Sequence, residues 1–169
     1  MNPTEVYQFH QTPPALAKEL VKFVPLQPND TVCEPFRGEG AFYNHFPAFV
    51  QKDWAEIQQG KDYKDISGQY DWMITNPPFR LQEEGGQKTN AFWKLLDWAS
   101  KKCRKGLGFL GNRECFCALT PKRLTLLEAR GFYLTKLVIC NVKKWHGRYY
   151  FVVFEKRNPA FLAYLEETF

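Results

Sequence analysis

The chain has 169 residues, of which 24% are charged, 44% hydrophobic and 17% aromatic, and its formal net charge is +5. The length predicts one domain over residues 1–169, and the aromatic content excludes an intrinsically disordered chain. No apolar run approaches the roughly 18 residues that span a bilayer, and the N-terminus does not resemble a secretory signal. We therefore expect a cytoplasmic protein with no membrane partner.

The excess of Lys and Arg, 23 against 18 acidic residues, weakly favours a polyanionic partner such as nucleic acid. The five cysteines are odd in number and include no CxxC pair. This pattern predicts neither a disulfide framework nor a zinc site, and no metal is expected.

Helix and strand patterns alternate along the first half of the chain. Thr12 is expected to cap an amphipathic helix over residues 13–24. A short buried strand at 31–34 follows, and a further helix is expected from about 41 to 47. A weaker strand is expected over 53–57, and a buried strand over 70–75 stops at an Asn-Pro-Pro sequence.

The second half continues the alternation and ends differently. Residues 80–90 are polar and contain glycine, which predicts a mobile loop, and a helix is expected over 91–102. A buried strand over 106–111 and a helix from 121 to 131 come next. Two long strands, 132–142 and 149–156, are joined without a helix and therefore predict an antiparallel hairpin. A short helix is expected after Pro159.

This order predicts an α/β fold with a largely parallel sheet covered by helices on both faces. In such sheets ligands bind beyond the carboxyl ends of the strands, where the strand order reverses. The unusual residues of this sequence all follow expected strands, so we expect them to meet at one edge of the sheet.

The first candidate site is the loop Glu34-Pro35-Phe36-Arg37-Gly38-Glu39-Gly40. Its glycines would let the backbone approach a ligand closely, and Glu34 at the strand end could accept hydrogen bonds from a cationic amine. The carboxylates would repel a pyrophosphate, and the spacing is not that of the dinucleotide fingerprint. A simple tight turn would use the same glycines.

The second candidate site is Asn76-Pro77-Pro78-Phe79. The exocyclic amine of adenine is a poor nucleophile because its lone pair is delocalised into the ring. The Asn76 side-chain carbonyl and the Pro77 backbone carbonyl could accept its two N–H groups and favour a pyramidal nitrogen. The prolines would hold these acceptors rigid, and Phe79 offers a face for a flipped base. A rigid exit turn explains the prolines but not Asn76 or Phe79.

The connection between the last two strands mixes cations with aromatic residues. Cations meet phosphates and aromatic rings stack on bases, so this composition favours nucleic-acid binding. An exposed basic hairpin with Trp145 partly in the core would show the same residues. The candidate contacts are Lys143, Lys144, Trp145, Arg148 and Tyr149, and Arg80 and Lys88 could clamp the same backbone.

Taken together, these motifs resemble the class I S-adenosylmethionine-dependent methyltransferases that act on amino groups, above all the adenine-N(6) nucleic-acid branch. The resemblance implies a Rossmann-like, mixed seven-stranded sheet and S-adenosyl-L-methionine as cofactor. It makes Asn76, Pro77, Pro78 and Phe79 the catalytic motif. The cofactor residues that it implies are Phe9, Gln11, Thr12, Pro13, Glu34, Pro35, Phe36, Gly38, Gly40, Glu56 at the ribose, Asp62 and Tyr63 at the adenine, and Asn76.

The resemblance makes adenine in DNA the expected target. Adenine in RNA, glutamine in a protein, and an inactive nucleic-acid-binding subunit of a methyltransferase complex remain alternatives. The sequence shows no insertion of the size of a target-recognition domain, so specificity would be loose, directed to nucleic-acid shape, or supplied by a partner or a homodimer. This minimal form is similar to enzymes of phages, viruses and mobile elements.

Overall fold

The computed structural model of the chain describes residues 11–82 and 88–157, except for the side chains of Gln82, Lys88 and Thr89. Phe9, the side chain of Lys88 and the helix expected after Pro159 therefore lie outside the described residues. Within the described part of the chain, no helix combines the length and the apolar character that crossing a membrane requires.

Six strands form one mixed sheet in the order β2-β1-β3-β6-β8-β7. The first four of these are mutually parallel, and β8 is antiparallel to both β6 and β7. The strands of this sheet are β1 (Thr31–Glu34), β2 (Gln51–Trp54), β3 (Tyr70–Thr75), β6 (Cys103–Asn112), β7 (Tyr133–Cys140) and β8 (Tyr149–Glu155).

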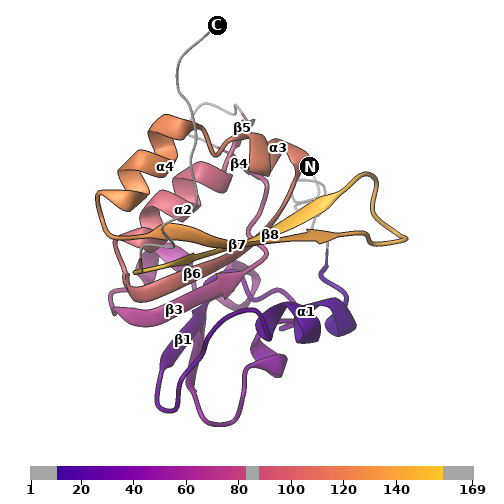
Figure 1. Ribbon diagram of the computed structural model, residues 1–169. Helices are drawn as coiled ribbons and strands as arrows, with labels where there is room; N and C mark the ends of the chain where they lie inside the picture. The colour runs from indigo at the N-terminus through magenta and orange to yellow at the C-terminus, as the bar shows by residue number, and fades with distance from the viewer. Residues whose placement is uncertain (1–10, 83–87, 158–169) are drawn as a thin grey trace, which may run out of the picture.

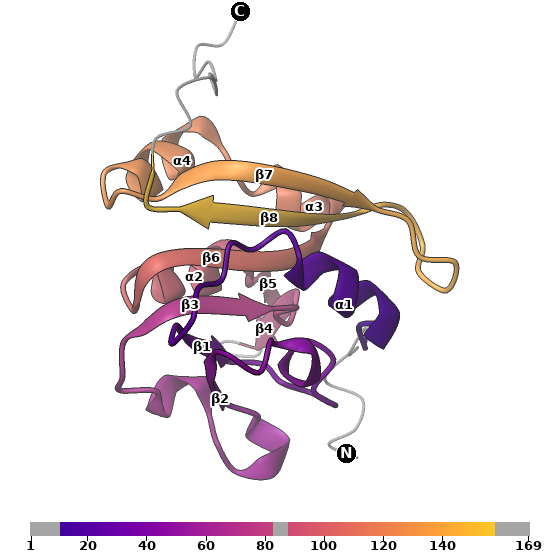
Figure 2. The same cartoon turned by 60° about the horizontal axis from the view of Figure 1, so that its bottom comes forward.

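The helices lie on both faces of this sheet, as the alternation predicts. Figures 1 and 2 show α1 on one face and α2 and α4 on the other, while the β7–β8 connection projects past the sheet. Buried apolar side chains form one cluster on each side. The helices are α1 (Pro14–Val21), α2 (Phe92–Ser100), α3 (Arg113–Cys117) and α4 (Pro121–Glu128).

The sheet has six strands rather than the expected seven within the described residues. Between β2 and β3 the chain forms two short 3-10 helices, η3 (Ile57–Gln59) and η4 (Tyr63–Asp65). The carboxylates of Glu56 and Asp62 accept backbone N–H groups at the starts of these turns, which favours helical turns over an extended strand.

Three local expectations are wrong. The helix expected from residue 41 is only the 3-10 helix η2 (Tyr43–His45), and Thr12 does not cap α1, because Pro13 occupies the cap position without a side-chain bond. Residues 80–90, expected as a loop, include a short antiparallel pair, β4 (Arg80–Gln82) and β5 (Lys88–Asn90). The expected α2, α4 and terminal hairpin are confirmed.

A polar network holds the amino edge of the sheet. The Trp72 indole N–H donates to buried Asp30 at 3.1 Å, and the Thr31 amide N–H donates to Asp71 at 2.9 Å. Lys105 and Arg104 on β6 pair with these two carboxylates. Burial raises the pKa of Asp71, but the Thr31 hydrogen bond and the Arg104 guanidinium outweigh it and hold that pKa below its ordinary value. The network thus joins β1, β3 and β6.

Candidate active site

The candidate site forms where the strand order reverses. β1 lies between β2 and β3, so the chain leaves β1 toward one side of the sheet and later returns on the other. The register pairs Cys33 with Met73, and both strands end at the carboxyl edge. The loop after Glu34 and the motif after Thr75 therefore begin on adjacent strands, at the position where α/β sheets bind ligands.

Two glycines in left-handed backbone conformations shape the loop after β1. Gly38 has a φ of 51° and Gly40 a φ of 84°, values that side-chain-bearing residues rarely adopt. A Cβ at Gly38 would lie 3.2 Å from the Gln11 amide oxygen. The bare Gly38 backbone thus lets the N-terminal segment lie close against the loop.

Glu56 ties this loop to the segment after β2. Its carboxylate is buried and accepts the Gly38 amide N–H at 2.6 Å and the Gln58 N–H at 3.1 Å. The Arg37 amide N–H also donates to the Ala55 carbonyl at 2.9 Å. Glu56 therefore lies beside the glycine loop, as its expected part in the cofactor site requires. Its contact with a ribose stays a prediction.

Glu34 is a buried acid at the end of β1. It is 2% exposed, and its Oε2 accepts the Tyr43 amide N–H at 2.7 Å. Burial raises the pKa of Glu34 well above its ordinary value, although the Tyr43 hydrogen bond and the Arg37 guanidinium oppose that rise. A cationic group near Glu34 would favour its ionised form, so this acid is suited to a cationic ligand.

Arg37 is a site residue that the sequence analysis did not single out. Its guanidinium lies 5.1 Å from the Tyr43 ring centroid and 4.7 Å from that of Trp54, and it donates to Gln59 at 3.1 Å. Tyr43 and Trp54 are 11 residues apart in the chain, so no local pattern indicates that they enclose Arg37. An arginine inside a glycine loop is the one sequence signal available.

Asp62 and Tyr63, the residues expected at a cofactor adenine, lie at the start of η4. Asp62 accepts the Lys64 N–H at 3.0 Å and so caps this turn. The half-buried Tyr63 ring lies 4.9 Å from Phe36 and 5.0 Å from Trp98 between centroids. Phe36 and Tyr63 thus come together from different loops, which offers an apolar wall beside the glycine loop.

The motif after β3 contacts the N-terminal segment directly. The Asn76 amide Nδ2 donates to the Thr12 hydroxyl at 3.1 Å, across 64 residues of sequence. Thr12 is buried, and Pro13 follows it as the residue preceding α1. The structure therefore brings together Thr12 and Asn76, two residues that the sequence analysis assigned to one site.

Phe79 is the first of three neighbouring aromatic rings that form a row from the motif to the β7–β8 hairpin. Its centroid lies 6.1 Å from that of Tyr149, which in turn lies 4.3 Å from that of Trp145. Tyr149 is buried, while Phe79 and Trp145 are half-buried. Tyr149 therefore backs the other two rings, and the partly exposed faces belong to Phe79 and Trp145.

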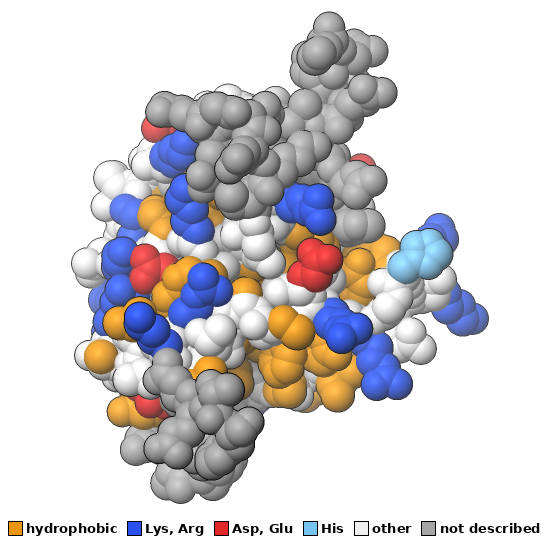
Figure 3. Space-filling view, turned by 90° about the horizontal axis from the view of Figure 1, so that it is seen from above, with side chains coloured by type: hydrophobic (Ala, Val, Ile, Leu, Met, Phe, Trp, Pro, Cys, Tyr) orange, Lys and Arg blue, Asp and Glu red, His pale blue; other side chains and the backbone are white. Residues whose placement is uncertain are grey.

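The cations expected to meet a polyanion lie around this row. Lys143, Lys144 and Arg148 are exposed on the β7–β8 connection, where Figure 3 shows basic side chains gathered at its projecting end. Arg80 is also exposed, and its Nη2 lies 3.9 Å from Oε2 of Glu114. The hairpin cations are therefore exposed on the same connection as Trp145, and their contact with a polyanion stays a prediction.

Comparison with known proteins gives the fold. No protein-family model matches the sequence, and no curated protein does either. Similar solved structures include TrmN from Thermus thermophilus, with 18% identity and a TM-score of 0.59 over 85% of this chain and 49% of TrmN. The magnesium protoporphyrin IX methyltransferase ChlM from Synechocystis, with bound S-adenosylmethionine, has 13% identity and a TM-score of 0.57 over 83% of this chain and 76% of ChlM.

A modification subunit assigned to a type I restriction enzyme of Vibrio vulnificus has 13% identity and a TM-score of 0.63 over 86% of this chain and 44% of that subunit. The chain thus spans about half of TrmN and less than half of the modification subunit. At these identities the likeness concerns the fold. The chain has the Rossmann-like fold of class I methyltransferases.

The buried acid gives a pH-dependent prediction. Because the folded-state pKa of Glu34 is raised, protonated Glu34 favours the folded state. This contribution to stability is fully present at pH values below the unfolded-state pKa of Glu34 and is lost as the pH rises through its folded-state pKa. Glu34→Gln should therefore gain in free energy of unfolding relative to wild type as pH rises from about 4.5 to 8. Urea denaturation at several pH values measures this difference. Glu39→Gln, which changes an exposed carboxyl in the same loop, is the control, and a pH-independent difference for Glu34→Gln would contradict the prediction.

Proposed function

We propose that the chain transfers the methyl group of S-adenosylmethionine to the exocyclic amino group of adenine in DNA. The observation that carries this proposal is the position of Asn76-Pro77-Pro78-Phe79, directly after β3 and next to the strand that leads into the glycine loop. The fold shared with ChlM, which is solved with bound S-adenosylmethionine, supports the choice of methyl donor. The fold shared with a restriction-modification subunit supports the choice of DNA.

The residues at the carboxyl edge fit S-adenosylmethionine. The left-handed glycines leave the backbone of the loop without side chains where Gln11 and Asn44 approach it. We assign buried Glu34 to the cationic amino end of this ligand, Gly38, Gly40 and Glu56 to its middle, and Asp62 and Tyr63 to its adenine. When bound, the sulfonium supplies an electrophilic methyl group and a neutral thioether leaving group.

Asn76 and Pro77 would prepare the nucleophile. Their carbonyl oxygens would accept the two N–H groups of the target amine, which directs the nitrogen lone pair out of the ring plane. The amine held by Asn76 and Pro77 would accept the methyl group that bound S-adenosylmethionine supplies, and the methylated nitrogen would release its extra proton to water. The prolines limit backbone motion here, and the Phe79 carbonyl accepts the Ala91 N–H at 3.0 Å, which anchors the end of the motif.

Thr12 would position the Asn76 amide. An amide can turn its oxygen or its nitrogen toward a substrate, and only the oxygen accepts an amine N–H. Because the Asn76 nitrogen donates to Thr12 at 3.1 Å, the oxygen is directed away from Thr12. In this orientation the Asn76 oxygen would be the atom that accepts the target amine.

The first prediction from the proposed function concerns turnover and substrate. With labelled methyl donor, wild-type protein should modify DNA, and Asn76→Ala should lower kcat by about 100-fold or more while changing the dissociation constant of S-adenosylmethionine far less. DNA, RNA and protein are offered in parallel, and digestion identifies the modified unit. Label found only in RNA adenine or in protein glutamine would replace DNA as the substrate. Equal loss of binding and turnover would contradict the role of Asn76.

The second prediction separates positioning from packing. Thr12→Val removes the hydroxyl at nearly constant volume and should lower kcat by about 10-fold or more at saturating substrates, because a misplaced amide weakens catalysis steeply. Thr12→Ser keeps the hydroxyl and should restore most of the activity. Thermal denaturation of both variants checks that the fold is retained. If Thr12→Ser loses as much activity as Thr12→Val, the hydroxyl has no positioning role.

The third prediction concerns the hairpin. Neutralising Lys143, Lys144 and Arg148 together as Gln should weaken DNA binding and make the slope of log K against log salt shallower by about 2 to 3. Fluorescence anisotropy at several salt concentrations gives both quantities. The matched control neutralises Lys18, Lys64 and Lys122, which are exposed on other elements. Equal effects of the two triple variants would place the DNA-binding face elsewhere.

A further inference from the structure

The strand β7 forms one border of the sheet and presents an apolar edge. In the described part of the chain it pairs only with β8, so the backbone groups on its other side are not paired with a strand. Figure 2 shows β7 at the outer border of the sheet. Ile139 is 61% exposed and Leu137 is 44% exposed. An exposed apolar edge of this kind is a template for pairing with a further strand.

The second half of β7 lacks the features that usually protect an edge strand. Such edges carry charges, prolines or bulges that prevent pairing with another chain. The single charge of β7 is Lys136, and its Nζ lies 3.4 Å from Oε2 of Glu155. The register shift precedes Lys136, so residues 136–140 pair with β8 without interruption. At the other border of the sheet, two of the four residues of β2 are charged. The edge open to pairing is therefore β7.

The exposed side chains of β7 lie on the face of the sheet that carries α2 and α4. Val138 packs with the cluster that contains Ala17 of α1, on the opposite face. Consecutive side chains of a strand point to opposite faces, so Leu137 and Ile139 share the α4 face. Figure 1 shows α4 over the end of β7 that is farther from the hairpin connection. The end of β7 near the connection is therefore left uncovered by α4.

The apolar surface continues from β7 onto β8 and α3. Ile139 is the register partner of Tyr150, so their side chains are neighbours on this face. The half-buried rings of Tyr150 and Phe116 stack, with centroids 4.6 Å apart and an interplanar angle of 18°. Figure 3 views this face and shows hydrophobic side chains gathered beside the projecting hairpin. We call Leu137, Ile139, Tyr150 and Phe116 the apolar border patch.

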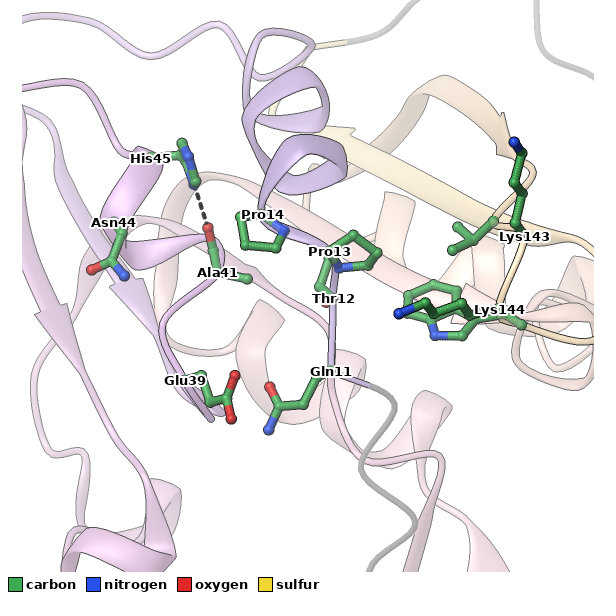
Figure 4. A pocket seen from close by; sticks show the side chains of 12 residues that line it. Gln11, Thr12, Pro13, Pro14, Glu39, Ala41, Asn44, His45, Lys143 and Lys144 are labelled. Atoms are coloured by element: carbon green, nitrogen blue, oxygen red, sulfur yellow. Dashed lines mark hydrogen bonds between the residues drawn. The ribbon is translucent and has the colours of Figure 1, made fainter.

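The apolar border patch is separate from the cavity beside the candidate active site. That cavity has a volume of about 600 Å³ and lies between residues 11–14, the segment 39–45 and residues 142–145. Figure 4 shows Pro13 and Pro14 on one side of it and Lys143 and Lys144 on the other. The residues described around it include none of the apolar border patch. The cavity adjoins α1 and the patch lies on the α4 face, so a partner on the patch would leave the cavity open.

A second copy of the chain fits this edge. In an antiparallel pair about a two-fold axis, each strand presents to its copy the same backbone donors and acceptors that it receives. If the axis passes through Val138, Leu137 of each copy lies opposite Ile139 of the other. The next residues on the same face, Thr135 and Asn141, then lie opposite each other. This register matches apolar with apolar and polar with polar side chains.

Charge and size are compatible with this pair. The two Lys136 residues would be about 13 Å apart along the strands, and each is already paired with Glu155. The basic hairpin connections would lie at opposite ends of the pair, because the strands are antiparallel. The eight residues of β7 give an edge of about 26 Å, so the interface is small even with the apolar border patch. Small interfaces are weak, and we expect a dissociation constant in the micromolar range.

We propose that the chain forms a two-fold dimer in which β7 pairs antiparallel with β7 of a second copy, joining two six-stranded sheets into one. Leu137 and Ile139 form the apolar centre of this interface. β7 runs parallel to β3, because β6 is parallel to β3 and β8 is antiparallel to both β6 and β7. The carboxyl edges of the two copies therefore point in opposite directions, and the two candidate active sites act separately. The proposal does not depend on the proposed function.

Sedimentation velocity over a concentration series tests the dimer. Wild type should form a dimer as its concentration rises, and Ile139→Lys should raise the dissociation constant by about 10-fold or more, because it places a charge in an apolar contact twice per dimer. Ile57→Lys is the matched control, since Ile57 is 54% exposed and lies on η3. A wild type that stays monomeric across the micromolar range, or equal weakening by both variants, would overturn the proposal.

Two double variants test the position of the axis. Leu137→Lys combined with Ile139→Lys places like charges opposite each other twice, whereas Leu137→Lys combined with Ile139→Glu places opposite charges there. Both remove the same apolar side chains, so the proposed register predicts that the second variant dimerises about 10-fold more tightly than the first. High salt should reduce this difference. Thermal denaturation checks that both variants are folded, and equal dissociation constants would defeat the register about Val138.

Discussion

The parallel pairing of β1 with β3 is the constraint on which the candidate site depends. The two strands share only two register pairs, Val32 with Trp72 and Cys33 with Met73, so the pairing needs support from elsewhere. The buried bond from Trp72 to Asp30 and the bonds between Thr31 and Asp71 supply it at the amino edge. Because that edge is held, the opposite edge presents the glycine loop and the Asn-Pro-Pro-Phe motif side by side.

At the carboxyl edge, hydrogen bonds between different segments hold the loops in place, as helices and strands hold the backbone elsewhere. Glu34 accepts the Tyr43 amide, Glu56 accepts the Gly38 amide and Asn76 donates to Thr12, and none of these pairs lies within one helix or strand. Forming such a bond removes both groups from water, so it stabilises the fold only if the two partners stay aligned. The edge is therefore pre-formed, with its acidic groups engaged by backbone N–H groups and directed by them.

These same contacts explain where sequence-based prediction succeeded and where it failed. Strands 31–34 and 70–75 and the helix over 92–100 are apolar patterns that local reasoning finds, and their place in a mixed sheet follows from their order. The helix expected near residue 41 failed because Gly38 and Gly40 are left-handed and the Tyr43 amide bonds to Glu34 instead of a preceding carbonyl. Local propensity was overridden there by a tertiary hydrogen bond.

Some residues of the candidate site can be found from sequence motifs, and others only from the tertiary structure. Glu34, Gly38 and Asn76 could be selected because they belong to motifs that directly follow expected strands. Arg37 has only its place in the glycine loop as a signal, and its enclosure by Tyr43 and Trp54 is visible only in the fold. Tertiary packing also joins the end of the motif to the hairpin: Tyr149 is buried and contacts both Phe79 and Trp145, so close packing limits how far any of the three rings can move.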